Sequence, residues 1–162
     1  MTAAGLPRVG STQRPEGDLL AWFRAGAAEL VHVLETTPPT ILGGALLIHG
    51  LSDSPYSMRR VAEVLRGHGL YSLSLRMPGH GTVPAGLSHV EWEDWMAATR
   101  LAVREAKRWI DPSAPLHLVG FSNGGALAMQ YALDALEDAA LPRPGRLVLI
   151  SPMIGITAFA RF

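Results

Sequence analysis

The stretch that decides the fold is Leu116-His117-Leu118-Val119-Gly120-Phe121-Ser122-Asn123-Gly124-Gly125, in which a short apolar run stops at a serine flanked by glycines. An apolar run of this length is typical of a buried parallel strand, and the residues behind the serine begin a helical pattern. The turn between the two elements must therefore be very tight. We expect Ser122 at its tip, with strained backbone angles that only small residues at Gly120 and Gly124 tolerate.

A serine in such a turn is suited to acyl transfer. Its hydroxyl would project above the edge of the sheet, and the backbone N–H of Asn123, at the helix N-terminus, would point at an oxyanion formed there. The pattern from Gly120 to Gly124 is weak on its own, and an ordinary turn is the alternative. The strand and the helix predicted on either side favour the catalytic interpretation.

The composition is that of a globular domain, with 162 residues, 48% hydrophobic and 17% charged. Lys plus Arg and Asp plus Glu number 14 each, which argues against a nucleic-acid partner and fits a neutral small-molecule or acyl substrate. The absence of cysteine excludes disulfides, thiolate metal sites and a cysteine nucleophile. The sequence contains no run of about 18 apolar residues and no secretory signal pattern, so we expect a soluble, cytoplasmic protein without a membrane span. The oligomeric state is left open.

The N-terminal segment divides into two parts. Residues 1–17 are rich in glycine and proline without apolar periodicity, which predicts a flexible tail. From Asp18 onward apolar residues recur at helical spacing until Pro38-Pro39. This pattern predicts an amphipathic helix over residues 18–37 that packs on the domain.

Residues 40–162 alternate short apolar runs with amphipathic stretches. The strands are expected at 45–50, 70–75, 116–119 and 146–152, and the helices at 55–67, 92–110 and 124–136. The helix at 92–110 is expected to begin with a capping box from Ser88 to Glu91. The order β-α-β-α-β-α-β with near-continuous apolar strands predicts an α/β fold with a mainly parallel sheet and helices on both faces.

Three features of this domain occur in a specific order. They are the His49-Gly50 turn after one strand, the Pro78-Gly79-His80-Gly81 loop after the next, and the Gly120–Gly124 elbow. From about Ala45 to Pro152 the chain resembles the N-terminal part of an α/β-hydrolase core. It is most similar to the carboxylesterase and monoacylglycerol-lipase-like branch, which implies an esterase-like or lipase-like hydrolase of carboxylic esters.

The resemblance also implies roles for particular residues. Ser122 would be the nucleophile, and the backbone N–H groups of Leu51 and Asn123 would form the oxyanion hole. His49 and Gly50 would support the turn that carries Leu51, and Gly120 and Gly124 would support the elbow. No cofactor is implied, and the expected partner is a small acyl ester.

The sequence departs from the family after the elbow. The family supplies its acid and then its histidine after the serine, but His117 is the last histidine here. The acidic residues that follow Ser122 lie one to four turns into the next helix and point away: Asp134, Glu137 and Asp138. We therefore expect a truncated hydrolase whose 162 residues are inactive alone. The alternative is a non-catalytic binding or interaction module on the same fold.

Other candidate residues have simpler interpretations. His80 is a conceivable base for Ser122, but a loop histidine bonded to backbone is the favoured interpretation. No metal site is assigned, because His32 and His68 lack partners at ligand spacing. The tryptophans at helical spacing are expected in the core: Trp92, Trp95 and Trp109. Acyl contact and an uncovered core edge are equal alternatives for the residues after the last strand: Met153, Ile154 and Ile156.

Overall fold

The computed structural model describes residues 34–81 and 84–155. The strands are β1 (Leu34–Thr36), β2 (Gly43–Ile48), β3 (Leu70–Leu75), β4 (Leu116–Phe121) and β5 (Leu147–Ile150). The helices are α2 (Arg59–Gly67), α3 (Trp92–Arg108) and α4 (Asn123–Glu137), and two short 3₁₀ helices, η2 (Pro55–Met58) and η3 (Pro84–His89), precede α2 and α3. The strands and helices predicted after residue 40 are therefore all present within the described residues.

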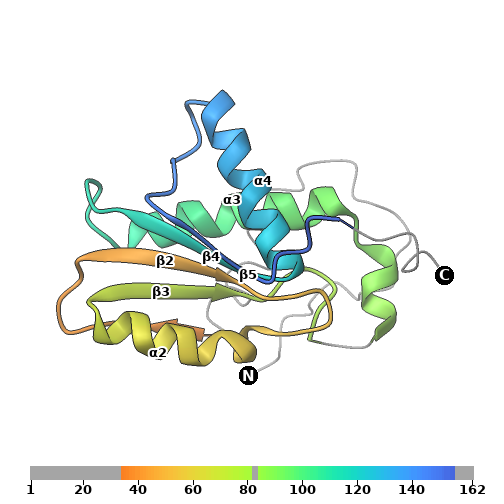
Figure 1. Ribbon diagram of the computed structural model, residues 1–162, viewed down its shortest axis with the longest axis horizontal. Helices are drawn as coiled ribbons and strands as arrows, with labels where there is room; N and C mark the ends of the chain where they lie inside the picture. The colour runs from red at the N-terminus through yellow and green to blue at the C-terminus, as the bar shows by residue number, and fades with distance from the viewer. Residues whose placement is uncertain (1–33, 82–83, 156–162) are drawn as a thin grey trace, which may run out of the picture.

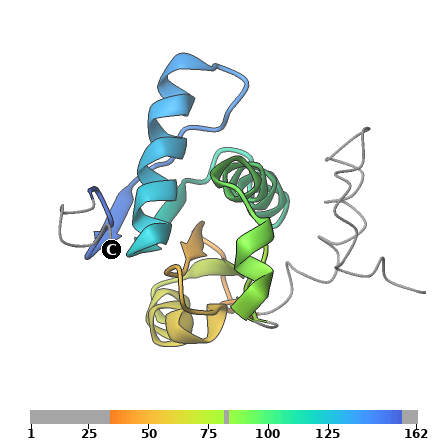
Figure 2. The same ribbon diagram turned by 90° about the vertical axis from the view of Figure 1, so that its right-hand side faces the viewer.

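The strands form one sheet in the order β1-β3-β2-β4-β5 (Figure 1). Strands β2 to β5 are parallel to one another. Strand β1 pairs antiparallel with β3. In the view along the sheet, α3 and α4 lie on one face and α2 on the other (Figure 2). The predicted fold class, a mainly parallel α/β sheet with helices on both faces, is confirmed.

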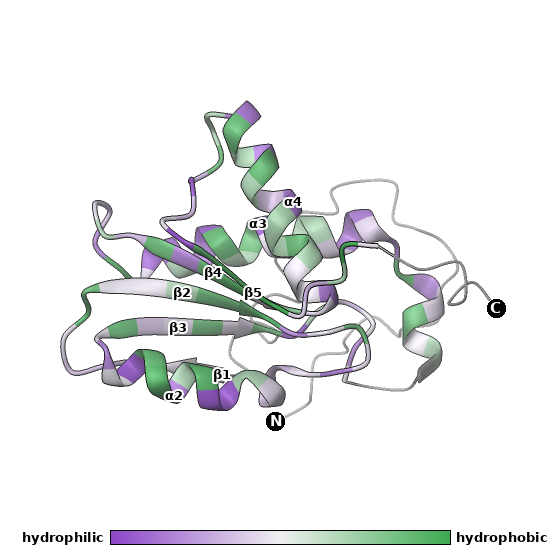
Figure 3. Cartoon of the chain, viewed as in Figure 1, coloured by the Kyte–Doolittle hydropathy of each residue, from purple (hydrophilic) through white to green (hydrophobic). Residues whose placement is uncertain are grey.

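The core has two layers because successive side chains of a strand point to opposite faces. Leu46, Ile48 and Leu118 pack under α3 and α4 in the larger cluster. Ala45, Leu47 and Val119 face α2 in the smaller one. The hydropathy colouring follows this arrangement, with apolar residues along the central strands and polar residues toward the outer sides of the helices (Figure 3). Burial on both faces explains why the central strands are continuous apolar runs.

The prediction of a helix over residues 18–37 is wrong at its C-terminal end. Residues 34–36 form strand β1, in which the Thr36 hydroxyl lies 2.6 Å from that of Ser72. A β-branched residue close to Pro38 favours extended backbone, and pairing with β3 stabilises that conformation. The rest of this predicted helix and the predicted tail at 1–17 lie outside the described residues.

The cap of α3 also differs from the prediction. The helix begins one turn later than the proposed Ser88–Glu91 box, with Glu91 as N-cap, and the Glu91 N–H donates to the Asp94 carboxylate at 2.9 Å. Ser88 instead lies in η3 and donates to the Ala85 carbonyl at 2.6 Å. Both stretches carry a residue that can accept from a backbone N–H, so the sequence pattern alone did not separate them.

Strand β5 is an apolar strand at the edge of the sheet. Leu147, Val148 and Ile150 are 36%, 45% and 37% exposed. Among residues 34–81 and 84–155, β5 pairs only with β4. This edge therefore offers unpaired backbone groups beside apolar side chains.

Tyr131 gives a pH-dependent contribution to stability. Its side chain is fully buried in α4, and its hydroxyl donates to the Pro142 carbonyl at 3.0 Å. Burial raises the pKa of Tyr131 to about 12. In the unfolded chain the phenol loses its proton at about pH 10, so the unfolded state binds fewer protons between these two pKa values. Stability must therefore fall as pH rises through this window.

We expect the Tyr131→Phe variant to lose this alkaline dependence. Wild type should lose up to about 1.4 kcal/mol of unfolding free energy per pH unit above pH 10, as measured by urea unfolding at a series of pH values. Tyr56→Phe is the matched control, because Tyr56 is 66% exposed. An unchanged alkaline slope in Tyr131→Phe would contradict the assignment.

Candidate active site

Ser122 is the single residue between β4 and α4. Its φ of 51° and ψ of −117° place it in a region that residues with a side chain rarely adopt. Such a conformation costs on the order of 1–3 kcal/mol. Ser122 is partly exposed, and no cap hydrogen bond from its side chain to the helix is formed. The structure therefore has the tight, strained turn expected from the sequence, with a partly exposed serine at its tip.

The flanking glycines are required by close backbone contacts. A Cβ at Gly120 would overlap the carbonyl oxygen of Gly124. A Cβ at Gly124 would overlap the carbonyl oxygens of Ile48 and His49 at the end of β2. Backbone atoms of a central strand cannot move aside without disturbing the sheet. Glycine at both positions is thus a condition for packing α4 against the strand ends.

The turn after β2 lies against Ser122. Strands β2 and β4 are parallel neighbours with Ile48 opposite Gly120, so their C-terminal ends meet at the same edge. A Cβ at Gly50 would lie 3.3 Å from the Ser122 Cβ. The structure therefore brings the Gly50–Leu51 turn and the elbow together, although they are far apart in the sequence.

Two backbone donors at this edge are free. Over residues 34–81 and 84–155, the N–H groups of Leu51 and Asn123 donate no hydrogen bond to another backbone group. Asn123 is the first residue of α4, so its N–H belongs to the unsatisfied first turn of the helix. Free N–H groups at the positive end of a helix stabilise negative charge. Among the described residues, the fold itself therefore gives neither N–H group a backbone acceptor.

His49 is buried and fixes the turn that precedes Leu51. Its Nδ1 lies 2.8 Å from the Gly50 carbonyl oxygen, and its Nε2 accepts from the Met77 N–H at 3.2 Å. These partners require a neutral ring with its proton on Nδ1. Burial lowers the pKa of His49, in agreement with the neutral form, while the bond to Gly50 opposes that shift. Both nitrogens are bonded to backbone groups, and the role of His49 in shaping an oxyanion turn stays a prediction.

His80 is a loop histidine bonded to backbone. It is only 6% exposed, its Nδ1 lies 3.0 Å from the Pro78 carbonyl oxygen, and its Nε2 lies 2.5 Å from the Leu51 carbonyl oxygen. The favoured interpretation from the sequence is therefore confirmed. Both ring nitrogens face carbonyl oxygens rather than Ser122, so a neutral ring donates to one carbonyl and directs its unprotonated nitrogen at the other.

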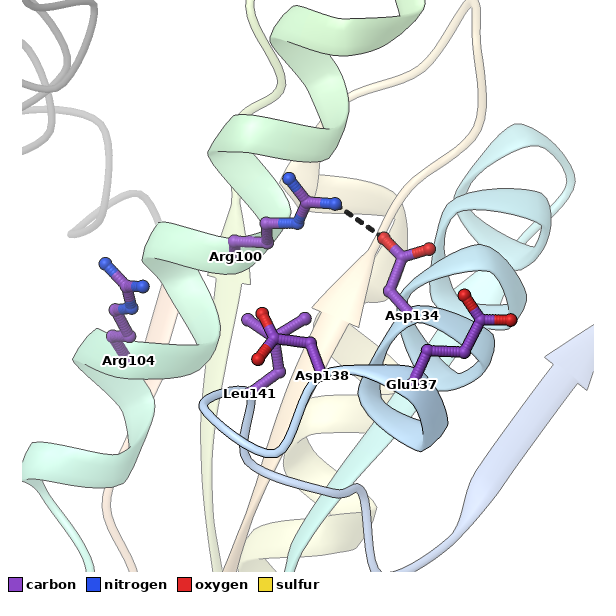
Figure 4. A pocket seen from close by; sticks show the side chains of 6 residues that line it. All are labelled: Arg100, Arg104, Asp134, Glu137, Asp138 and Leu141. Carbon is purple, nitrogen blue, oxygen red and sulfur yellow. Dashed lines mark hydrogen bonds and ion pairs between the residues drawn. The ribbon is translucent and has the colours of Figure 1, made fainter.

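The acidic residues after the elbow lie at the far end of α4. Asp134 follows Ser122 by about three turns of helix, or roughly 18 Å along the axis. Its carboxylate accepts from Arg100 at 2.6 Å and from Gln130 at 2.8 Å, and the bond from Arg100 is the main reason why the pKa of Asp134 is lowered. Asp134, Glu137 and Asp138 line a hollow beside α3 with two arginines (Figure 4). This polar hollow is separate from Ser122.

The tryptophans differ in their packing. Trp95 is half-buried against the core, and its ring N–H donates to the Pro78 carbonyl at 3.1 Å. Trp92 and Trp109 are 38% and 47% exposed, so the prediction that they are core residues is wrong. Both stand at an end of α3, where helical spacing no longer determines burial.

Residues after β5 approach the elbow. The Met153 N–H donates to the Ser122 carbonyl at 3.0 Å. A shallow, mainly apolar hollow next to this bond is lined by Trp92, Ala126, Met129, Gln130, Met153, Ile154 and Gly155. Met153 and Ile154 therefore lie near the candidate nucleophile, and Ile156 lies outside the described residues.

Residues 42–161 match the family described as serine aminopeptidase S33. The thermostable monoacylglycerol lipase of Bacillus sp. (strain H-257) is 32% identical over 90 residues, which cover 55% of this chain and 34% of that protein. Phospholipase YtpA of Bacillus subtilis (strain 168) is 25% identical over 115 residues, covering 68% and 40%. The chain thus spans between a third and two fifths of the length of these relatives.

Solved structures show the same fold. A structure from work on LipS and LipT, two metagenome-derived lipolytic enzymes, matches with a TM-score of 0.62 and 30% identity over 73% of this chain and 45% of that one. Monoacylglycerol lipase of Paleococcus ferrophilus matches with a TM-score of 0.60 and 23% identity over 78% of this chain and 47% of that one.

In the part of the chain that the structure describes, no helix is long and apolar enough to span a membrane.

Proposed function

Because the chain belongs to the serine aminopeptidase S33 family of α/β-hydrolases, we propose that it provides the nucleophile and the oxyanion hole of a serine hydrolase that cleaves carboxylic esters. The observation that carries the proposal is the strained, partly exposed Ser122 at the start of α4, packed against the Gly50–Leu51 turn. The lipase and phospholipase relatives support an acyl ester as the substrate class.

In the proposed reaction the Ser122 Oγ attacks the ester carbonyl carbon. The carbonyl oxygen becomes an oxyanion that accepts from the N–H groups of Leu51 and Asn123, and the N-terminus of α4 adds its positive partial charge. Collapse of this tetrahedral species breaks the bond to the alkoxy oxygen, which takes up the proton that the base removed from Ser122 and leaves as the alcohol. Water then attacks the acyl group on Ser122, which releases the carboxylic acid and restores the hydroxyl. Each oxyanion donor of this kind is worth on the order of 100-fold to 1000-fold in turnover.

The proton acceptor is not among the described residues in this proposal. The ring nitrogens of His49 and His80 are directed at backbone groups and not at Ser122. A serine hydroxyl is a weak nucleophile until a neighbouring base takes its proton. Imidazole added to the solution can supply that base, which allows the remaining machinery to be tested on this chain.

A fluorophosphonate probe tests the proposal. We expect it to label Ser122 in the 162-residue chain, faster when imidazole is present, with the site located by peptide mass spectrometry. Ser122→Ala should abolish the labelling. Ser151→Ala is the matched control and should leave it unchanged, because Ser151 is an exposed serine close to the elbow.

A different result would favour the other candidate. If wild type and Ser122→Ala acquire the probe at the same slow rate with imidazole present, Ser122 is an idle hydroxyl. The chain would then keep the hydrolase fold as a binding or interaction module.

A further inference from the structure

Two histidines hold the carbonyl groups of consecutive residues in the turn after β2. His49 bonds the Gly50 carbonyl, and His80, from the loop after β3, contacts the Leu51 carbonyl at 2.5 Å. The two rings pack edge to face with their centroids 4.9 Å apart. The turn that carries the proposed oxyanion donor is therefore held by a contact with the loop after β3.

We propose that His80 is a positioning residue, which holds the Leu51 carbonyl and thereby fixes the direction of the Leu51 N–H toward Ser122. The inference rests on the proposed function of that N–H. His80 touches neither the nucleophile nor the substrate in this role and acts through the turn.

The proposal follows from how little else anchors Leu51. Its side chain is 39% exposed, so packing fixes it only weakly. The peptide before it is held through the Gly50 carbonyl, which accepts from His49 and from the Asp53 N–H at 3.3 Å. The peptide after it is held through the Leu51 carbonyl by His80. A trans peptide is planar, so the Leu51 N–H points opposite to the Gly50 carbonyl. The Leu51 carbonyl lies in the next peptide, and holding it restricts the φ and ψ rotations at Leu51 through which the Gly50 peptide could turn.

His80 is itself held rigidly by its loop. The residues on either side, Gly79 and Gly81, have φ angles of 78° and 73°, which glycine adopts without strain. A Cβ at Gly79 would lie 2.8 Å from the Gly86 carbonyl oxygen. The centroids of the His80 and Trp95 rings are 5.9 Å apart, and the Trp95 ring N–H donates to the Pro78 carbonyl that the His80 Nδ1 also faces. The Gly-His-Gly motif thus turns this ring inward onto the oxyanion turn.

The bond that carries the proposal is donated by Nε2. A carbonyl oxygen only accepts, so Nε2 must carry a proton to bond Leu51. A neutral ring with its proton on Nε2 already makes this bond. We expect long-range ¹H–¹⁵N spectra of the wild-type chain to show a protonated Nε2 on His80, and a bare Nε2 would overturn the proposal without any variant.

Two substitutions separate positioning from packing. His80→Leu fills much of the ring's space but has no donor, whereas His80→Gln places an amide N–H near the Nε2 position. The control is His68→Leu, since His68 is an exposed loop histidine bonded to the Val64 carbonyl. The first measurement is the ¹H–¹⁵N amide spectrum. The Leu51 and Ser52 signals should move in His80→Leu, stay near wild type in His80→Gln and be unaffected in His68→Leu.

The second measurement is the rate of phosphonate labelling of Ser122 with imidazole present. An error of about 1 Å in the position of a catalytic group can cost 100-fold. We expect a loss of that order in His80→Leu, with most of the rate restored in His80→Gln. Equal rates in His80→Leu and His68→Leu would overturn the proposal. If the wild type is not labelled at all, the proposed function fails, and the amide spectra still decide whether His80 holds the turn.

Discussion

Purified protein of these 162 residues is expected to hydrolyse p-nitrophenyl esters no faster than its Ser122→Ala variant. The reason is that the histidine and the acid that such a reaction requires are not found beside Ser122 among residues 34–81 and 84–155. Every histidine in the chain precedes Ser122, and the ring nitrogens of His49 and His80 already have backbone partners. Loss of such a triad in serine hydrolases costs about 10⁶-fold in turnover and leaves roughly 10³-fold to 10⁴-fold over water.

Initial rates for both proteins with a short-chain ester, measured against a buffer blank, give the comparison. His80→Gln provides a second reference, because it removes the imidazole while keeping a donor toward Leu51. Rapid turnover by wild type that disappears in both Ser122→Ala and His80→Gln would show that His80 is the base. That outcome would contradict the structural role assigned to its ring.

Gly124→Ala is expected to destabilise the fold by about 3 kcal/mol or more. The new methyl group would meet the carbonyl oxygens of Ile48, in the central strand β2, and of His49, in the turn that follows it. Overpacking usually costs about 1–3 kcal/mol, and backbone atoms relax less readily than side chains. We expect a melting temperature lower by roughly 10 °C.

Gly67→Ala is the matched control for this change. Gly67 is also a helical glycine, at the end of α2, and a Cβ there would meet nothing within 4 Å. Its unfolding free energy should lie within about 1 kcal/mol of wild type, on the stabilising side. Urea unfolding of both variants measures the difference. Equal midpoints would mean that α4 can shift away from the strand ends.

The sequence was most informative where burial imposes a period. The strands β2 to β5 are short apolar runs between loop residues, and the glycine-flanked serine locates the elbow between β4 and α4. Strand β1 could not be recognised, because three residues at the edge of the sheet have no period and follow a helical pattern. The exposure of Trp92 and Trp109 depends on where α3 ends relative to the sheet, which spacing does not encode.

The positions of individual site residues could be predicted from the sequence, but the contacts between distant residues could not. Ser122 and the neighbouring glycines follow from local sequence, whereas the roles of Leu51 and Asn123 stay predictions. The contact between His80 and Leu51 joins residues 29 positions apart. It depends on the parallel pairing of β2 and β3, which brings the loops after both strands to one edge. No local pattern carries that information, although the Gly-His-Gly motif marks the loop involved.

The elbow also shares hydrogen bonds with the edge strand β5. The Ser122 N–H donates to the Ile150 carbonyl at 3.0 Å, and the Ser122 carbonyl accepts from Met153. Local opening of a protein requires least free energy where few groups are buried, and β5 is such a place. When this strand frays, Ser122 loses partners on both sides, and its strained φ of 51° can relax. In native-state hydrogen exchange the Ser122 and Met153 amides should therefore exchange together with β5 and well before the amides of β2. The strained conformation of Ser122 thus persists only as long as β5 stays paired.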